Sequence, residues 1–156
     1  MNPNEQLIYD FYSAFQARDG GKMVSFYHPN VDFSDAAFGE LHGRQATAMW
    51  RMLCARGADL KIAFERIHAD DKTGSAHWEA WYTFSATGRK VHNVIEATFA
   101  FKDGKIIEHR DRFNFWRWAA QALGPLGLLL GWTPYLQGKV RAQALSGLEA
   151  FMKKNA

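Results

Sequence analysis

Acidic side chains and histidines alternate along one stretch of the chain, residues 75–115. Two short turn signals divide this stretch into three antiparallel strands: Asp103-Gly104 is a strong two-residue hairpin signal, and Thr87-Gly88 is a weaker one. Counting outward from two-residue turns places three carboxylates in one row, namely Glu79, Glu96 and Asp111. Carboxylates about 5 Å apart raise one another's pKa, which suits general acid/base catalysis at neutral pH.

The neighbouring rows of this register share the same face of the predicted sheet. They are His77, Thr98, His109 on one side, and Trp81, Val94, Phe113 followed by Thr83, His92, Phe115 on the other. The opposite face carries Trp78, Ala80, Tyr82, Ile95, Ala97 and Phe99. Periodicity alone leaves open which of the two faces forms the core, and a one-residue bulge would change the rows.

Another candidate acid follows a short apolar strand over residues 31–36. Asp35 alternates with Phe33, so both side chains are expected on one face of that strand. A carboxylate in this place could act in catalysis. The alternative is that Asp35 only caps the turn that follows, which is rich in glycine and charge.

A metal site is a further kind of chemistry that histidines and acids can support. His77, Glu79, His109 and Asp111 resemble a mixed His/carboxylate ligand set. The two pairs lie on strands separated by the middle strand, ~10 Å apart, which is too far for one ion. No metal is therefore predicted. The chain also contains no sequence motif of nucleotide-binding proteins, serine hydrolases, zinc proteases or dithiol oxidoreductases, and no organic cofactor is expected.

The elements that must position these residues follow from hydrophobic periodicity. Helices are expected at residues 3–18, 22–27, 43–56, 116–123 and 138–153, and strands at 31–36, 60–69 and three times within 75–115. Residues 124–137 form an irregular apolar segment. This order predicts an α+β protein with helices on one face of a strongly curved antiparallel sheet.

Composition narrows the classes of protein that fit. A chain of 156 residues with 47% hydrophobic and 15% aromatic residues predicts a single folded domain. The net charge of +3 comes from scattered basic residues, so no nucleic acid partner is expected.

Cys54 is the single cysteine, which excludes an internal disulfide. The N-terminus does not resemble an export signal, and the apolar run 124–132 is too short to span a bilayer, so we expect a cytoplasmic protein with no membrane partner.

Several short segments, in this order, resemble the NTF2-like superfamily, which includes ketosteroid isomerases, limonene-epoxide hydrolases and SnoaL-type polyketide cyclases. The segments are Ala17-Arg18-Asp19, Tyr27-His28-Pro29, Val31–Asp35, Phe38–Arg44 and Phe101–Asp111. The resemblance covers residues 5–120. It implies a cone-shaped α+β barrel with helices packed on the concave side of the sheet around a pocket. Residues 1–156 would be one such domain, with 117–156 as a C-terminal helical extension.

The resemblance also implies roles for single residues. Asp35 matches the general-base aspartate of the ketosteroid isomerases, and Glu96 lies near their oxyanion-hole acid. Their hydrogen-bonding tyrosine aligns with Phe11 or Tyr12. If Phe11 is the counterpart, that donor is missing and steroid isomerisation is not expected.

The epoxide hydrolases are the second source of matching positions. Their Arg and Asp, two residues apart on a middle strand, match His77 and Glu79, and a later Asp matches Asp111. Histidine at position 77 replaces the arginine, so epoxide hydrolysis itself is not expected. In that family these side chains point into the pocket, which implies that the row of acids faces inward.

Together these arguments predict an enzyme that uses general acid/base catalysis on a small hydrophobic molecule, as an isomerase, a cyclase or a hydrolase. The expected catalytic residues are Asp35, Asp111, Glu79, Glu96, His77 and His109, and the expected substrate-binding residues are Tyr12, Phe33, Trp50, Trp81, His92 and Phe113. A homodimer is expected. The alternatives are a module that binds a hydrophobic ligand without catalysis, or a dimeric interaction domain that uses residues 124–136 for contacts.

Overall fold

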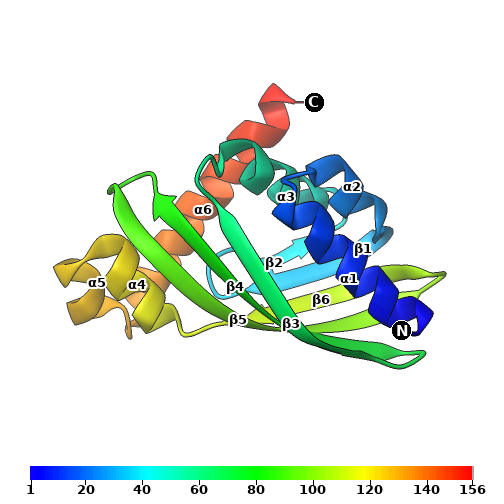
Figure 1. Cartoon of the computed structure of the whole chain (residues 1–156). Coiled ribbons are helices and arrows are strands. Elements are labelled where there is room, and N and C mark those ends of the chain that lie inside the picture. The colour runs from blue at the N-terminus through cyan, green and yellow to red at the C-terminus, as the bar shows by residue number, and fades with distance from the viewer. Residues whose placement is uncertain (156) are drawn as a thin grey trace.

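A curved six-stranded sheet forms the frame of the protein in a computed structural model that describes residues 1–155 (Figure 1). The elements, in chain order, are α1 (Pro3–Gln16), α2 (Gly20–Ser25), β1 (Tyr27–Asp35), β2 (Gly39–His42), α3 (Arg44–Arg56), β3 (Lys61–Ala69), β4 (Thr73–Phe84), β5 (Arg89–Lys102), β6 (Lys105–Arg112), α4 (Phe115–Leu123), α5 (Pro125–Leu130) and α6 (Pro134–Lys154).

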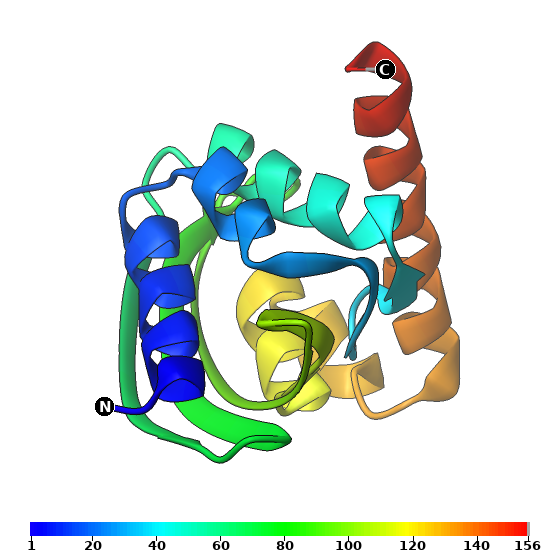
Figure 2. The ribbon, with the colours of Figure 1, turned by 90° about the vertical axis from the view of Figure 1, so that its right-hand side faces the viewer.

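The strands follow the order β2-β1-β6-β5-β4-β3 across the sheet. Every neighbouring pair is antiparallel except β1 and β6, which run parallel. The sheet curves without closing, and α1, α2 and α3 lie within the curve (Figure 2). The predicted α+β class, with a curved sheet and helices on one face, is confirmed. We call the face that packs against α1 and α3 the inner face.

The helices follow directly from local sequence signals. Asn2 caps α1 by accepting a hydrogen bond from the backbone of Glu5, whose side chain accepts one from the Asn2 backbone in return. The apolar stripe of α1 then packs Phe11, Tyr12 and Phe15 against the inner face of the sheet, where all three are fully buried. This stripe, together with Trp50 of α3, fills the space between the helices and the sheet with aromatic rings.

The predicted pairing of β4 with β5 is wrong by two residues. The last pair before the turn is Phe84 with Arg89, so the loop has four residues, 85–88, where a two-residue Thr-Gly turn was expected. The backbone N–H of Gly88 donates to the carbonyl of Phe84 at 2.8 Å, and Gly88 adopts φ +73°. A shift of two residues preserves the faces of both strands but changes the partners. Glu79 therefore lies opposite Val94, and Glu96 opposite His77.

The predicted pairing of β5 with β6 fails for a different reason. The Asp103-Gly104 turn has two residues as expected, with both φ angles positive, and Lys102 pairs with Lys105. The register then shifts between Ala100 and Phe101, which pair with Glu108 and Ile106. The extra residue on β6 is a β-bulge, which turns every later side chain of that strand to the other face. Asp111 therefore lies opposite Ala97, on the face away from Glu79 and Glu96.

These two register changes separate the predicted row of acids. The inner face is the one that carries Trp78, Ala80, Ile95, Ala97 and Phe99, all buried, and the bulge adds His109 and Asp111 to it. The outer face carries His77, Glu79, Trp81, His92 and Glu96. The predicted rows containing Thr98 with His77, Phe113 with Trp81, and Phe115 with Thr83 are wrong for the same reason.

Three further elements differ from the prediction. Residues 39–42, expected within a loop, form the edge strand β2 against β1. The apolar segment expected to be irregular contains α5, and α6 begins at Pro134 rather than at residue 138. No helix within residues 1–155 is long and apolar enough to cross a membrane.

Candidate functional site

A chain of buried polar side chains crosses the inner face of the sheet. Trp50 Nε1–H donates to the hydroxyl oxygen of Tyr27 at 2.7 Å, and that hydroxyl lies 2.7 Å from Nδ1 of His109. On the other side of its ring, His109 Nε2 lies 2.9 Å from Oδ1 of Asp111. Trp78 Nε1–H also donates to this oxygen, at 3.2 Å. These five side chains come from α3, β1, β6 and β4, so the chain links elements that are distant in sequence.

The direction of each hydrogen bond follows from the groups at the two ends. An indole nitrogen can only donate and a carboxylate can only accept. The proton of His109 therefore lies on Nε2 and points at Asp111, while Nδ1 accepts the hydroxyl proton of Tyr27. Burial raises the pKa of the Tyr27 hydroxyl well above its usual value, which keeps that proton in place. His109 itself is fully buried between aromatic rings, with Trp50 stacked at 5.8 Å and Phe99 at 4.4 Å.

Tyr12 lies beside this chain with its hydroxyl unused. Its ring packs against Trp78, with the two ring centroids 5.8 Å apart, and the residue is fully buried. The hydroxyl has no hydrogen-bond partner among residues 1–155. Burial, and after it the charge of Asp111, raise the pKa of this hydroxyl well above its usual value. Tyr12 therefore carries a protonated, fully buried hydroxyl that has no partner among residues 1–155.

Asp35 lies at the end of β1, on the same face as Phe33, as alternation predicted. Its Oδ1 accepts the backbone N–H of Ala37 at 2.9 Å and of Phe38 at 2.6 Å, so it caps the turn into β2. Burial raises the pKa of Asp35 to about 7, although these two hydrogen bonds act in the opposite direction. The charge of Asp111 adds to the increase, which indicates that the two carboxylates share one electrostatic environment.

Partly exposed aromatic side chains border the turn that carries Asp35. Tyr82, Phe113 and Ala36 pack against one small apolar cluster built largely from residues of α4. Trp118 Nε1–H donates to the hydroxyl oxygen of Tyr82 at 2.7 Å, which leaves the hydroxyl proton of Tyr82 free to be donated. Burial raises the pKa of Tyr82 to about 12, so the proton is retained at neutral pH. The surroundings of Asp35 thus include apolar and aromatic side chains.

The C-terminal helix α6 completes this region, which the sequence did not predict. Gln137 Nε2–H donates to the carbonyl of Ala36 at 3.2 Å, and Arg141 Nη2–H donates to the same oxygen at 3.3 Å. The Arg141 guanidinium partly offsets the rise in the pKa of Asp35. Its Nε is buried with no partner among residues 1–155. No local sequence signal could have located these contacts, because they join residues more than 100 positions apart.

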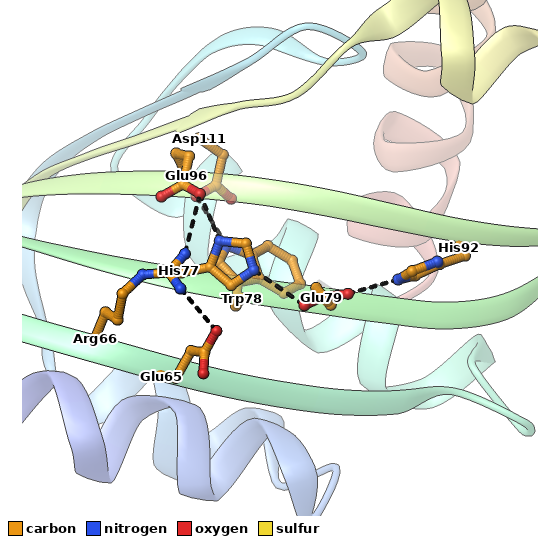
Figure 3. Close-up of polar contacts among 8 residues, drawn as sticks. All are labelled: Glu65, Arg66, His77, Trp78, Glu79, His92, Glu96 and Asp111. Carbon is orange, nitrogen blue, oxygen red and sulfur yellow. Dashed lines mark hydrogen bonds and ion pairs between the residues drawn. The ribbon is translucent and has the colours of Figure 1, made fainter.

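The acids and histidines of the outer face form a separate cluster (Figure 3). His77 Nδ1 bonds to Glu96, and His77 Nε2 lies 3.0 Å from Glu79. Glu79 in turn lies 2.7 Å from His92 Nε2, and His92 stacks on Trp81 at 4.6 Å. The bond to Glu96 raises the pKa of His77, and the bond from His77 lowers the pKa of Glu79. The cluster is an ion-pair network in which each group has partners.

One subset of this network has the spacing of a metal site. Single ligand atoms of Glu65, His77 and Glu79 lie within 4.8 Å of one another. Both ring nitrogens of His77 already bond to carboxylates, and Arg66 pairs with Glu65 at 2.9 Å. The set considered from the sequence, which joined His77 and Glu79 to His109 and Asp111, is not assembled, because the two pairs lie on opposite faces.

The structure thus divides the predicted site residues into two groups. On the inner side of the sheet lie Asp111 and His109 of β6, Asp35 at the end of β1, and the buried side chains of Tyr12, Phe33 and Trp50, with Phe113 at the border. Glu79, Glu96, His77, Trp81 and His92 lie on the outer face. Two surface depressions, of about 550 Å³ and 520 Å³, are lined by other residues of α4 with β5 and of α2 with α3 and α6.

Comparison with known proteins agrees with this fold. The model of the SnoaL-like domain matches residues 8–109, which is more than half of the chain. No curated protein matches the chain.

Solved structures give the same result. An NTF2-like protein from Burkholderia thailandensis superposes with a TM-score of 0.68 at 19% identity, over 80% of this chain and 100% of that one. A putative SnoaL-like polyketide cyclase from Jannaschia sp. CCS1 has a TM-score of 0.68 at 13% identity, over 79% and 93%. An epoxide hydrolase from M. tuberculosis, similar to limonene-epoxide hydrolase, has a TM-score of 0.65 at 18% identity, over 82% and 96%. At these identities the likeness supports the fold alone.

Proposed function

Since the chain belongs to the family of SnoaL-like domains, we propose that it is an enzyme using general acid/base catalysis on a small hydrophobic molecule. The reaction types that suit the site are isomerisation, cyclisation, and hydrolysis or hydration, each of which needs a proton moved at a defined atom. Relatives of this fold include proteins described as a polyketide cyclase and an epoxide hydrolase, and these names support the same range of chemistry.

In this proposal Asp35 is the group that takes and returns the proton. A general base works best when its pKa lies near the working pH, and the pKa of Asp35, raised by burial to about 7, meets that condition. Its Oδ1 is held by the backbone N–H groups of Ala37 and Phe38, so Oδ2 is the oxygen that would meet the substrate.

Asp111 has a supporting part in the same scheme. His109 Nε2 and Trp78 Nε1 both contact its Oδ1, which fixes the carboxylate on the inner face. A fixed negative charge there raises the pKa of Asp35 and of Tyr12, and it would stabilise positive charge that develops on a substrate. His109 is fully buried and acts through Asp111, so we assign it a positioning role.

The donor for a developing oxyanion is the hydroxyl of Tyr12. It is fully buried, it has no partner within residues 1–155, and its pKa is raised, so it holds its proton and can donate it in a hydrogen bond. The unpartnered hydroxyl is the observation that carries the proposal, because a native core rarely leaves such a group unsatisfied without a role. Tyr12, rather than the neighbouring Phe11, is thus proposed as the counterpart of the family's tyrosine.

Isomerisation of a β,γ-unsaturated ketone such as cyclohex-3-enone is a direct test, because it requires abstraction and return of one proton. We expect turnover whose kcat/KM rises with pH through about 7, as Asp35 ionises. Asp35→Asn keeps both turn hydrogen bonds but should lower kcat by ~10²- to 10⁴-fold. Glu79→Gln on the outer face is the matched control and should leave kcat unchanged.

Full activity of the Asp35→Asn variant would contradict this assignment. Ketone binding that raises the melting temperature equally in the wild type and in Asp35→Asn, with no turnover in either, would instead support the ligand-binding alternative. The homodimer and the cytoplasmic location expected from the sequence stay predictions, and the mass of the particle in solution checks the first.

A further inference from the structure

One end of the molecule exposes an unusual number of large apolar side chains. Six of the nine large apolar residues that are exposed within residues 1–155 lie in one segment: Trp116, Leu126, Leu128, Leu129, Trp132 and Tyr135. Leu129 is 70% exposed and Tyr135 is 66% exposed. Single exposed apolar residues are ordinary, but a contiguous group marks a surface that contacts something. We call these six residues the apolar tip.

The contact between α5 and α4, made through glycine, fixes the position of the apolar tip. A Cβ on Gly127 would lie 1.8 Å from the carbonyl oxygen of Ala119, so α5 packs directly against α4 through glycine. Leu126, Leu128 and Leu129 of α5 then point away from the protein, whereas Leu130 packs against the apolar cluster that includes residues of α4. The indole of Trp116 donates to the carbonyl of Leu128 at 2.8 Å, and that of Trp132 to the carbonyl of Leu129 at 3.0 Å. The exposure is therefore built into the packing and does not come from a loose loop.

The tip projects from one end of the molecule, where α4 and α5 lie beyond the curve of the sheet (Figure 1). It is a protrusion rather than a groove. A protrusion cannot enclose a partner's helix or peptide, but it can insert among the acyl chains of a lipid bilayer. The six residues of α5 span only ~9 Å, so such a segment would enter the edge of a bilayer and not cross it.

The charged side chains that neighbour the tip in the sequence are all positive. No Asp or Glu occurs from residue 113 to residue 148, whereas Arg117, Lys139 and Arg141 lie in that stretch. Arg117 joins Arg89 and Lys90 in lining a surface depression of about 550 Å³ next to α4. Arg117 and Lys90 are both exposed, and Lys90 also pairs with Asp59 at 3.6 Å. Leucines beside exposed cations match the apolar core and the phosphate layer of an anionic lipid surface.

We propose that the apolar tip docks reversibly on an anionic membrane surface. Leu126, Leu128 and Leu129 enter below the headgroups. Trp116, Trp132 and Tyr135 lie at the interface, where amphipathic rings are favoured. Arg89, Lys90 and Arg117 contact lipid phosphates. A second copy of the chain is the less suitable occupant, because pairing two tips would bring the basic residues of both copies together. The sequence led us to expect no membrane partner, so this proposal departs from that expectation.

Sedimentation with lipid vesicles tests the proposal. The wild-type protein should bind vesicles of 30% phosphatidylglycerol in phosphatidylcholine at least tenfold more tightly than pure phosphatidylcholine, and 0.5 M NaCl should weaken the binding. On binding, the tryptophan emission should shift to the blue as Trp116 and Trp132 enter the interface. No binding to either kind of vesicle would overturn the proposal.

Paired variants separate the contribution of the apolar side chains to vesicle binding from that of the basic side chains. The double variant Leu128→Gln/Leu129→Gln should lose at least tenfold in vesicle affinity, whereas Tyr9→Gln, exposed on α1, should lose nothing. Lys90→Gln/Arg117→Gln should lose most of the preference for phosphatidylglycerol, and Lys22→Gln/Lys102→Gln, of equal charge change at other exposed sites, should keep it.

A measurement of the oligomeric state can contradict the membrane proposal. Without vesicles, the leucine variant should have the same mass by light scattering and the same melting temperature as the wild type, because both side chains are exposed. If the variant halves the mass of the particle, the tip is a contact between copies of this chain and the membrane proposal is wrong. The outcome is independent of the ketone assay, because none of these variants changes Asp35, Asp111 or Tyr12.

Discussion

Two tyrosine hydroxyls on the inner face are similarly buried but differ in their hydrogen bonds. The hydroxyl of Tyr27 accepts from Trp50 and donates to His109, whereas the hydroxyl of Tyr12 has no partner among residues 1–155. A buried hydroxyl that bridges two groups stabilises the fold, because its loss leaves both partners unsatisfied. A buried hydroxyl without a partner is costly to the fold, so it is retained for some other reason, which we take to be function.

Replacing each tyrosine by phenylalanine should therefore have opposite effects. Tyr27→Phe should lower the free energy of unfolding by ~2–4 kcal/mol, because Trp50 Nε1 and His109 Nδ1 each lose a partner. Tyr12→Phe should leave that free energy unchanged or raise it, while lowering turnover of the ketone. Urea denaturation of both variants measures the first effect. Equal destabilisation by the two substitutions would show that Tyr12 is structural.

At this scale the sequence predicted some positions well. Alternation placed Asp35 and Phe33 on one face, and the structure agrees. The hydrogen bond between Tyr27 and His109 joins residues 82 positions apart, so no local pattern could have predicted it. Arg141 was missed for the same reason, because it reaches Asp35 only through the packing of α6 on the turn after β1.

Secondary structure was largely predictable, but its register was not. The positions of most helices and strands follow from hydrophobic period and capping residues, as at Asn2 and Gly57. The register depends on loop length and on a single bulge, at Ala100 and Phe101, for which the sequence carries no strong signal. This one bulge transfers Asp111 from a surface row of acids to the buried inner face, so it determines which acids share a site.

The contact between α4 and α5 gives a prediction at the scale of elements. Gly127→Ala would place a methyl group 1.8 Å from a backbone oxygen of Ala119, which α5 can avoid only by moving away from α4. We expect a loss of ~1–3 kcal/mol in the free energy of unfolding. Gly138→Ala, in the interior of α6 with no atom within 4 Å of the added Cβ, is the control and should gain ~0.5–1 kcal/mol. Thermal unfolding compares the two, and equal melting temperatures would contradict the close packing.

The stability of the whole molecule depends on pH through every group whose pKa differs between the folded and unfolded states. Burial raises the pKa of Asp35 from 3.8 to about 7, so the folded state holds a proton that the unfolded state releases, and stability falls as pH rises between these values. The pKa of His77 is also raised above its usual 6.5 by Glu96, and the stability it contributes is lost as pH rises through the folded value. Both groups therefore act in the same direction. The carboxylates of Asp59, Asp70 and Glu79 have lowered pKa values and oppose unfolding until the pH falls below ~4.

We expect the free energy of unfolding to be greatest at about pH 4–5 and to decrease from there toward pH 8. Where only Asp35 titrates, the slope should approach ~1.4 kcal/mol per pH unit. Asp35→Asn should flatten the curve between pH 4 and 7, and His77→Gln should flatten it above pH 6.5. Urea denaturation at five or six pH values checks this. A maximum above pH 7 in the wild type would contradict both assignments.

The parallel pairing of β1 with β6 has a consequence for how the chain acquires its fold. Ser34 pairs with Arg110, 76 positions later, whereas the hairpins from β3 to β6 join neighbours in sequence. Closing so long a loop costs conformational entropy before any contact compensates for it. The β3–β6 meander should therefore form early and the docking of β1 late. During synthesis β1 can pair with β2 but must wait for its other neighbour, β6, so Asp35 and Asp111 first share the inner face after the ribosome has released β6.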